Sequence, residues 1–189
     1  MDRRIPTLET ERLIIRELMM DDLNSINNVL NKSFGWEMPL AERQRWLQWT
    51  VLGYEMFATL EQPHYGERAI VLKETGNIIG AVGIVPYLDT FNKATAFKRA
   101  SNSPATAEAG LFWAIDPTYH RKGYAPEAAR VVMEYLFIHD KIGRIIATTG
   151  YDNLPSQKVM EKLGMKIQRL DEPPSPDQFV VGVIEKDDF

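Results

Sequence analysis

The sequence predicts an α/β fold in which helices pack on a mixed β-sheet within one domain. The chain of 189 residues is long enough for one compact domain, and a chain of this size buries roughly 70% of its unfolded surface. Its composition, 44% hydrophobic and 25% charged, is typical of a soluble globular protein. Short β-branched segments alternate with segments of helical periodicity, which favours layers of helix on sheet.

Six segments have the composition of β-strands, because they are rich in β-branched and apolar residues and are bounded by turn residues. They are residues 10–18, 69–73, 78–85, 110–115, 144–149 and 179–184. A turn at residues 74–77 joins the second and third of these segments, so we expect them to form a hairpin.

Four segments have the spacing of helices. One starts after Asp22, and the others are residues 40–57, 126–138 and 155–163, the last of which is followed by the stop signal Gly164. Between strands and helices, residues at about 88–107 have little periodicity and many small polar side chains. We therefore expect a single domain over residues 1–189 with an inserted loop at about 88–107.

The composition argues against several classes of chemistry and partner. Without cysteine, the chain has no disulfide, no thiolate metal ligand and no cysteinyl acyl-enzyme, and we expect no metal ion. A net charge of −4 supplies no excess of basic residues for nucleic acid, and no apolar run is long enough to cross a membrane. The first residues lack the apolar core of a secretory signal, which favours a cytoplasmic protein.

The most informative segment is Tyr119 to Ala128, where a glycine turn leads from a predicted strand into a predicted helix. Backbone N–H groups at the start of a helix have no intrahelical partner, and the helix macrodipole adds positive charge there. Arg121 and Lys122 add cations, and Gly123 lets an anion approach the backbone. Such a turn suits a pyrophosphate, although an isolated turn of this kind is more often an ordinary solvated helix start.

Residues 110–128 resemble the acyl-CoA-binding motif of the GNAT (general N-acetyltransferase) superfamily, in which Gln/Arg-x-x-Gly-x-Gly/Ala follows the fourth strand. The chain reads His120-Arg121-Lys122-Gly123-Tyr124-Ala125 there and departs from the motif at His120. Residues 153–165 resemble the Asn-x-x-Ala/Ser…Glu-Lys-Leu-Gly-Phe segment of the same superfamily. Residues 9–16 are similar to the start of its RimJ/RimL-type branch, which is named for ribosomal-protein N-terminal acetyltransferases.

The resemblance implies a mixed, mostly antiparallel sheet of six to seven strands, splayed between strands four and five and flanked by about four helices. It also implies acetyl-CoA as cosubstrate, with its pyrophosphate on the glycine turn and its pantetheine arm between the splayed strands. The acceptor would be a primary amine, on a small molecule or at a protein N-terminus, and the chain a monomer or homodimer. The implied cofactor-binding residues are Trp113, Ala114, Ile115, His120, Arg121, Lys122, Gly123, Tyr124, Ala125, Asn153 and Ser156.

Direct transfer of an acetyl group needs a base for the incoming ammonium, donors for the oxyanion and a proton for the leaving thiolate. The resemblance implies that Glu108 is the base and acts through a water. Many GNAT enzymes use a tyrosine as the acid, but Met160 occupies that position here, and a thioether donates no proton. Ser156, four residues earlier on the same helical face, is the candidate acid, and Tyr151 is the second candidate.

Several alternatives stay open at this point. Asn153 and Ser156 also suit the cap of the helix that follows them. A catalytically silent CoA-binding regulatory module of the same fold is the main alternative to an enzyme, and a ribosome-associated RNA-binding factor would need a basic stripe that the sequence lacks. The aromatic residues of the second helical segment either wall a slot for the acceptor or, as is more common, belong to the core: Trp46, Trp49, Tyr54 and Phe57.

Overall fold

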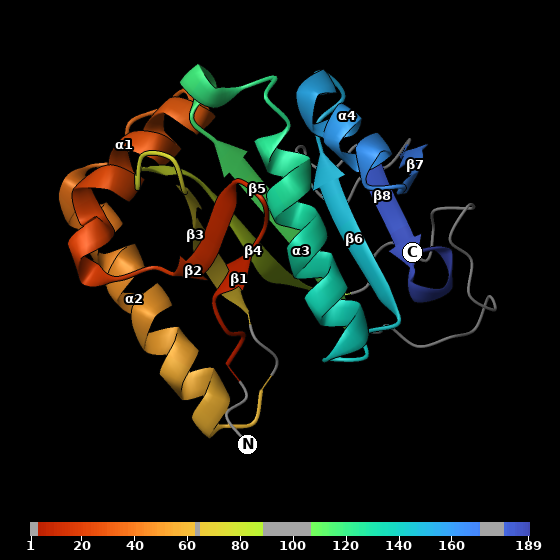
Figure 1. Ribbon diagram of the computed structural model, residues 1–189. Helices are drawn as coiled ribbons and strands as arrows, with labels where there is room; N and C mark the ends of the chain where they lie inside the picture. Colours follow the sequence, from red (N-terminus) through yellow and green to blue (C-terminus); the bar gives the residue numbers. More distant parts are fainter. Residues whose placement is uncertain (1–3, 63–64, 89–106, 171–179) are drawn as a thin grey trace. The chain divides into compact units, whose positions relative to one another are not determined.

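The computed structural model describes residues 4–62, 65–88, 107–170 and 180–189 (Figure 1). In these ranges the helices are α1 (Leu23–Phe34), α2 (Leu40–Thr59), α3 (Tyr124–Ile138) and α4 (Leu154–Lys162). The strands are β1 (Leu8–Glu9), β2 (Leu13–Glu17), β3 (Gly66–Leu72), β4 (Ile78–Leu88), β5 (Ala107–Ile115), β6 (Arg144–Thr149), β7 (Lys166–Arg169) and β8 (Val180–Glu185). Short 3₁₀ helices are η1 (Met20–Asp22), η4 (Pro117–Tyr119) and η5 (Lys186–Asp188).

Hydrogen bonds join the strands in the order β1-β2-β3-β4-β5-β6-β8-β7. Strands β5 and β6 are parallel, whereas β1–β2, β2–β3, β3–β4, β6–β8 and β7–β8 are antiparallel. The sheet is therefore mixed and mostly antiparallel, and the predicted fold class is confirmed. The sequence does not predict β1 and β7, the two short strands at the ends of this order, and they bring the sheet to eight strands.

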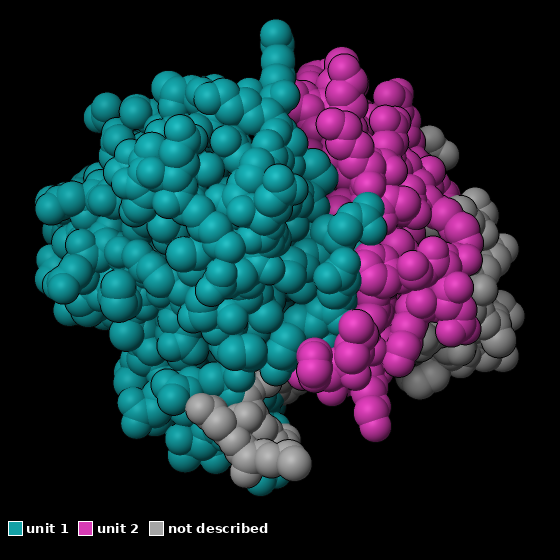
Figure 2. Space-filling view, viewed as in Figure 1, with its two compact units in different colours: residues 1–84, 112–135 teal, residues 85–111, 136–189 magenta. Residues whose placement is uncertain are grey.

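The chain forms two compact units, which Figure 2 colours separately. The first contains residues 1–84 and 112–135, and the second contains residues 85–111 and 136–189. Strands β4 and β5 and helix α3 each begin in one unit and end in the other. The predicted inserted loop falls mostly on residues 89–106, which lie outside the described residues, so the loop and the single-domain assignment stay predictions.

In the first unit α1 and α2 pack on each other and on the sheet (Figure 1). Ile26 and Leu30 lie four residues apart on one face of α1, and Ala69 and Val71 alternate along β3, so each pair points the same way. The buried residues of this core are Leu18, Ile26, Leu30, Leu47, Ala69, Val71, Ala81 and Ala114. Two layers, helices on one face of the strands, thus form a core between them.

In the second unit the antiparallel pair β6 and β8 carries much of the core. Helix α4 packs on these strands, and its Met160 is fully buried. A Cβ atom at Gly182 of β8 would lie only 3.0 Å from the sulfur of Met160, so the glycine makes room for that side chain. A cluster of buried apolar residues in this unit consists of Ile146, Leu170, Val181 and Val183, and Tyr87 packs against it.

Most element boundaries differ by a few residues from the predicted ones, and two of these differences have a local cause. Strand β2 begins at Leu13 rather than at Thr10, because the Thr10 hydroxyl accepts a hydrogen bond of 2.9 Å from the N–H of Leu13 and forms a turn. Helix α3 begins at Tyr124, two residues before Pro126. The proline still lies in the first turn, where its missing N–H has no intrahelical partner to lose.

Candidate functional site

Residues 116–123 connect the end of β5 to the start of α3. The N–H of Asp116 donates to the carbonyl of Ile79 on β4 at 2.9 Å, and its carboxylate accepts from the N–H of Thr118 at 2.9 Å. Burial raises the pKa of the Asp116 carboxyl, but hydrogen bonds from Thr118 and Lys32 outweigh burial and lower it. Asp116 is therefore an ionised anchor that fixes the start of the connection to the sheet.

The connection turns into α3 through two residues with positive φ, Arg121 at 63° and Gly123 at 84°. A positive φ is uncommon outside glycine, so the backbone at Arg121 is strained. Alternation of backbone handedness along a short segment directs successive N–H groups into one concavity, which suits an anion. Within the described part of the chain, no acceptor is found for the N–H groups of Arg121, Lys122, Gly123, Tyr124 and Ala125.

Cationic side chains flank this connection. Arg121 and Lys122 are exposed, and the ammonium of Lys122 lies 5.4 Å from the centre of the Tyr119 ring. Arg12, just before β2, lies over the Tyr124 ring, with its guanidinium carbon 4.5 Å from the ring centre. Since the N-terminus of α3 adds partial positive charge, the connection combines free donors with a positive field.

The carboxylate of Glu127, in the first turn of α3, is held by residues just before β2. One oxygen accepts from the Thr10 hydroxyl at 2.5 Å and from the N–H of Arg12 at 3.2 Å. The other accepts from Nε of Arg12 at 2.8 Å and from its Nη2. Burial raises the pKa of Glu127, but the hydrogen bonds from Thr10 and Arg12 outweigh burial and lower it.

Sequence reasoning misses the pair of Arg12 and Glu127, because 115 residues separate the two in the chain. The available signal is a carboxylate in the first turn of a predicted helix, which by itself suits the helix macrodipole and names no partner. Arg12 lies in residues 9–16, the segment that is similar to the RimJ/RimL-type branch, but that similarity assigns no role to the Arg12 side chain.

His120 turns back toward β5. Its Nε2 lies 2.8 Å from the carbonyl oxygen of Ile115, the last residue of the strand, so the tautomer with a proton on Nε2 donates there. This contact closes the connection over the strand end. The predicted contact of His120 with a cofactor stays a prediction.

The predicted contact residues at the end of β5 differ in exposure. Ala114 and Ile115 are buried, and Trp113 is half-buried. A Cβ atom at Gly80 of β4 would lie 2.4 Å from the carbonyl oxygen of Ala114, so glycine permits the close approach of these two strands. The side chains of Ala114 and Ile115 thus serve the core, and any cofactor contact would fall to backbone atoms.

Strand β5 pairs with β6 near its start. The register joins Ala109 to Ile145 and Gly110 to Ile146. Strand β5 continues to Ile115, so among the described residues its last part extends past the residues that pair with β6. Such a termination of pairing is what a splay between these strands requires.

In the second unit, Asn153 and Ser156 lie at the start of α4. The side-chain oxygen of Asn153 accepts from the N–H of Ser156 at 3.2 Å, so Asn153 is the N-cap of this helix. The hydroxyl of Tyr151 donates to the carbonyl of Leu170 at 2.6 Å, and Met160 points into the core. The predicted roles of Asn153, Ser156 and Tyr151 toward cofactor and leaving group stay predictions.

Glu108 lies in β5, but its side chain is outside the described part of the structure, so its role as a base stays a prediction. The aromatic residues of α2 divide between core and surface. Trp46 packs on the core of the first unit, and the Tyr54 hydroxyl accepts from the N–H of Leu18 at 3.1 Å. Trp49 is 62% exposed, so it is the aromatic residue of α2 most accessible to a ligand.

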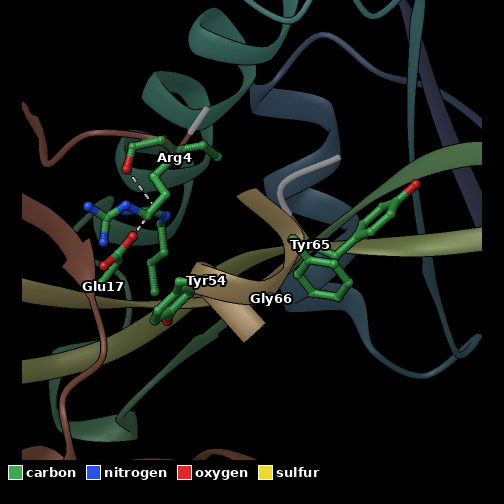
Figure 3. Close-up of a pocket in the computed structure, with 8 residues that line it drawn as sticks. Arg4, Glu17, Tyr54, Tyr65 and Gly66 are labelled. Carbon is green, nitrogen blue, oxygen red and sulfur yellow. Dashed lines mark hydrogen bonds and ion pairs between the residues drawn. The ribbon is translucent and has the colours of Figure 1, made fainter. Parts of the chain in front are cut away.

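Two hollows among the described residues of the first unit differ in size. The larger, about 760 Å³, lies where α1 ends and α2 begins, and its walls include Asn31, Lys32, Trp36 and Glu37. The smaller, about 10 Å³, is lined in part by Glu17, Tyr54, Tyr65 and Gly66 (Figure 3). A volume of about 10 Å³ holds at most one water molecule, so the larger hollow is the candidate for a ligand.

The described ranges of the chain contain neither a candidate metal site nor a membrane-spanning helix. In these ranges no three His, Asp or Glu side chains come together in a way that suits a metal ion. None of the helices described above has the length and apolar character needed to cross a bilayer.

Sequence comparison gives one family and several relatives. Residues 12–166 match the model of the acetyltransferase (GNAT) domain. YoaA of Bacillus subtilis, an uncharacterized N-acetyltransferase, is 27% identical over 167 residues, which cover 85% of this chain and 83% of YoaA. YnaD of the same organism, also an uncharacterized N-acetyltransferase, is 48% identical over 54 residues, but this match spans only 29% of the chain and 32% of YnaD.

Solved structures share the fold. An acetyltransferase from Agrobacterium tumefaciens superposes with a TM-score of 0.69 at 24% identity, covering 96% of this chain and 95% of that one. RimL, a ribosomal-protein α-N-acetyltransferase solved in complex with coenzyme A, superposes with a TM-score of 0.66 at 13% identity, covering 92% and 93%. Because the family model spans residues 12–166, well over half of the sequence, the chain belongs to the GNAT acetyltransferase family.

Proposed function

We propose that the chain transfers an acetyl group from acetyl-CoA directly to a primary amine. The observation that carries the proposal is the row of N–H groups from Arg121 to Ala125, at the start of α3 in a chain of the GNAT family. The solved RimL structure, which has the same fold, contains coenzyme A. Bound acetyl-CoA supplies the acetyl group as a thioester, and the residues of this chain bind it, orient it and move protons.

The diphosphate of coenzyme A is the group that the start of α3 fits. Backbone N–H groups there donate to phosphate oxygens, and the macrodipole favours negative charge. Gly123 adds no side-chain atoms next to these amides, and the space that a Cβ would occupy is open, with its nearest neighbour, Nη2 of Arg12, at 3.5 Å. We assign to the diphosphate His120, Arg121, Lys122, Gly123, Tyr124 and Ala125.

The pantetheine arm is assigned to the backbone at the end of β5. Amide groups of the arm pair with a free strand edge as an added strand would. This edge is assigned to the last residues of β5, which follow Gly110, the last residue of the strand that pairs with β6: Trp113, Ala114 and Ile115. On the family resemblance, Asn153 is assigned to the same arm in addition to its role as a helix cap.

Two proton transfers complete the proposed reaction. Glu108 takes a proton from the incoming ammonium through a water, and the free amine then attacks the acetyl carbon. As the new C–N bond forms and the C–S bond breaks, the leaving sulfur takes a proton from the Ser156 hydroxyl, and the second proton released by the amine nitrogen returns through water to the Ser156 oxygen. Tyr151 is the second candidate for this acid, although its hydroxyl already donates to Leu170.

The acceptor amine is assigned to the larger hollow, between α1 and α2. Lys32 lines this hollow and also binds Asp116 at the end of β5, with 3.2 Å between Nζ and the carboxylate oxygen. Phe34 of α1 contacts Phe112 of β5, with ring centres 6.1 Å apart. The hollow therefore adjoins the strand assigned to pantetheine, and its volume of about 760 Å³ admits a small amine or the first residues of a protein.

A catalytically silent CoA-binding module is the second candidate function. It is favoured by Met160, which occupies the position where many members of the family have a catalytic tyrosine and which is fully buried here. A sensor of this kind would bind coenzyme A but release no thiol in the presence of amines.

Calorimetry with coenzyme A, followed by thiol release from acetyl-CoA across a panel of small amines and peptide N-termini, tests the proposal. We expect binding and amine-dependent thiol release. Binding without release on any acceptor would favour the silent module, and a failure to bind coenzyme A would contradict both candidate functions.

The variant Glu108→Gln tests the base. We expect a lower turnover, most of all at low pH where the amine is protonated, with acetyl-CoA affinity unchanged. If the pH profiles of the variant and the wild type coincide, Glu108 has no part in the reaction.

A further inference from the structure

A carboxylate in the first turn of α3 is a potential competitor for the diphosphate. Carboxylate oxygens near a helix N-terminus readily accept from free backbone N–H groups, as capping side chains do. Glu127 lies one turn into the helix, and its own N–H donates to the carbonyl of Gly123 at 3.2 Å. An unrestrained Glu127 side chain would therefore sit close to the amides that the proposed function assigns to coenzyme A.

The structure holds this carboxylate on the side of β2. Thr10 and Arg12 supply four hydrogen bonds to it, two on each oxygen, so its acceptor positions are largely filled. All of these donors lie just before β2, more than a hundred residues from Glu127 in the sequence, and none of them belongs to the connection before α3. The Glu127 carboxylate is thus hydrogen-bonded without the backbone N–H groups of that connection, and these remain available to a ligand.

Arg12 also orients the connection itself. Its Nη1 donates to the carbonyl oxygen of Lys122 at 2.9 Å. In a planar trans peptide the carbonyl and the following N–H point in opposite directions, and the described residues contain no cis peptide bond. Because the Lys122 carbonyl points at Arg12, the N–H of Gly123 points away from Arg12 and stays open to a ligand.

We propose that Thr10 and Arg12 are positioning residues that keep Glu127 off the diphosphate site and fix the direction of the Gly123 N–H. This inference rests on the proposed function. Arg12 also compensates the negative charge of Glu127, which would otherwise repel a diphosphate at the same helix end. Replacing Arg12 removes its hold on Glu127, its hydrogen bond that orients the Gly123 N–H, and its compensating charge. Replacing Glu127 as well removes the carboxylate that competes for the amides.

The experiment is a double-mutant cycle on coenzyme A affinity with Arg12→Met, Glu127→Gln and the double variant, measured by calorimetry. We expect Arg12→Met to weaken binding by about tenfold, the loss typical of a charged hydrogen-bond network. We expect Glu127→Gln in the Arg12→Met background to restore most of that loss, because a neutral amide neither repels the diphosphate nor competes as strongly for the N–H groups.

Two controls separate positioning from general destabilisation. Arg16→Met breaks a comparable pair, in which Arg16 binds both oxygens of Asp22 at 2.7 and 2.9 Å. This variant should lower the melting temperature but leave coenzyme A affinity unchanged, so there is no loss of affinity for a second substitution to restore. Pantetheine, which lacks the diphosphate, should compete for the site equally well in the wild type and in Arg12→Met. Thermal unfolding without ligand shows that each variant is folded.

The outcomes separate the two proposals. If wild type binds coenzyme A and Arg12→Met binds equally well, or if the double variant binds no better than Arg12→Met, the positioning role is wrong and the proposed function stands. If pantetheine loses as much affinity as coenzyme A, the effect is structural and the positioning role is again wrong. If wild type does not bind coenzyme A, the proposed function and the inference both fail.

Discussion

Helices α3 and α4 both follow a strand of the sheet, α3 after β5 and α4 after β6, and both contain a proline in the first turn. In α4 the side chain of Asn153 accepts from the N–H of Ser156 at 3.2 Å. In α3 the residue before the helix is Gly123, which has no side chain to offer, and the carboxylate of the first turn is bound elsewhere. The start of α4 is capped by a side chain, and we call it the closed start. The start of α3 keeps backbone N–H groups without an acceptor among the described residues, and we call it the open start.

The difference shows how the same local architecture serves stability at one place and binding at another. A capped start satisfies an N–H that would otherwise need water, and it contributes to folding. An open start gives up that contribution and keeps donors for an anion. The strained φ of 63° at Arg121 is a further cost at the open start, and strain of this kind tends to persist at functional sites.

The largest effect is expected from a side chain at the open start. Gly123→Val should weaken coenzyme A binding by on the order of tenfold or more, because a β-branched residue disfavours the φ of 84° and crowds the amides. Gly150→Val is the matched control before α4, since nothing lies within 4 Å of a Cβ at Gly150 and its φ is ordinary. Calorimetry on both variants checks this, and equal affinities would place the diphosphate elsewhere.

The next effect belongs to the closed start. Asn153→Ala removes the cap of α4, so we expect the free energy of unfolding to fall by about 1 kcal/mol. Asn153→Ser keeps a capping oxygen and should recover most of that loss. Denaturant unfolding measures both, and a stable Asn153→Ala variant would show that the cap seen in the structure contributes little.

A smaller effect is expected when a charge at the open start is removed but its backbone shape is kept. Arg121→Gly relieves the positive φ and leaves the N–H groups in place, so coenzyme A affinity should fall only about two- to fivefold, the range of an exposed ion pair. The salt dependence of binding should also become shallower. A loss as large as that of Gly123→Val would mean that the side chain, rather than the backbone, holds the ligand.

The smallest expected effect is a pH dependence that distinguishes the two helix starts. The pKa of Glu127 in the folded chain lies below the ordinary value of 4.5, so the ionised carboxylate stabilises the fold above about pH 4.5, and that contribution is lost as the pH falls further. The stability difference between wild type and Glu127→Gln should therefore shrink below pH 4.5. The difference for Asn153→Ala should not change, because the amide does not titrate.

Much of the fold follows from local pattern. The predicted strand at 144–149 coincides with β6, because its apolar and β-branched residues are buried along most of its length. The sequence does not reveal β1, which has only two residues, or β7 (Lys166–Arg169), whose two end residues are exposed and whose two middle residues are half-buried. Both strands form because a neighbour offers them hydrogen bonds, and such pairing leaves no periodic signal.

The site is predictable to the extent that backbone chemistry determines it. Gly123 and the strand-to-helix order predict open N–H groups, and the structure has them at residues 121–125. The contact of His120 with Ile115 and the pair of Arg12 and Glu127 depend on tertiary placement of side chains. No spacing in the sequence indicates those contacts, because they arise only when the folded chain brings the side chains together.

The most direct test of the account is a crystal structure of the chain with coenzyme A bound. The account predicts diphosphate oxygens within hydrogen-bond distance, about 2.7–3.2 Å, of backbone nitrogens among residues 121–125, with Glu127 still bound to Arg12. A diphosphate located elsewhere, or a Glu127 carboxylate that occupies those nitrogens while coenzyme A is bound, would contradict it.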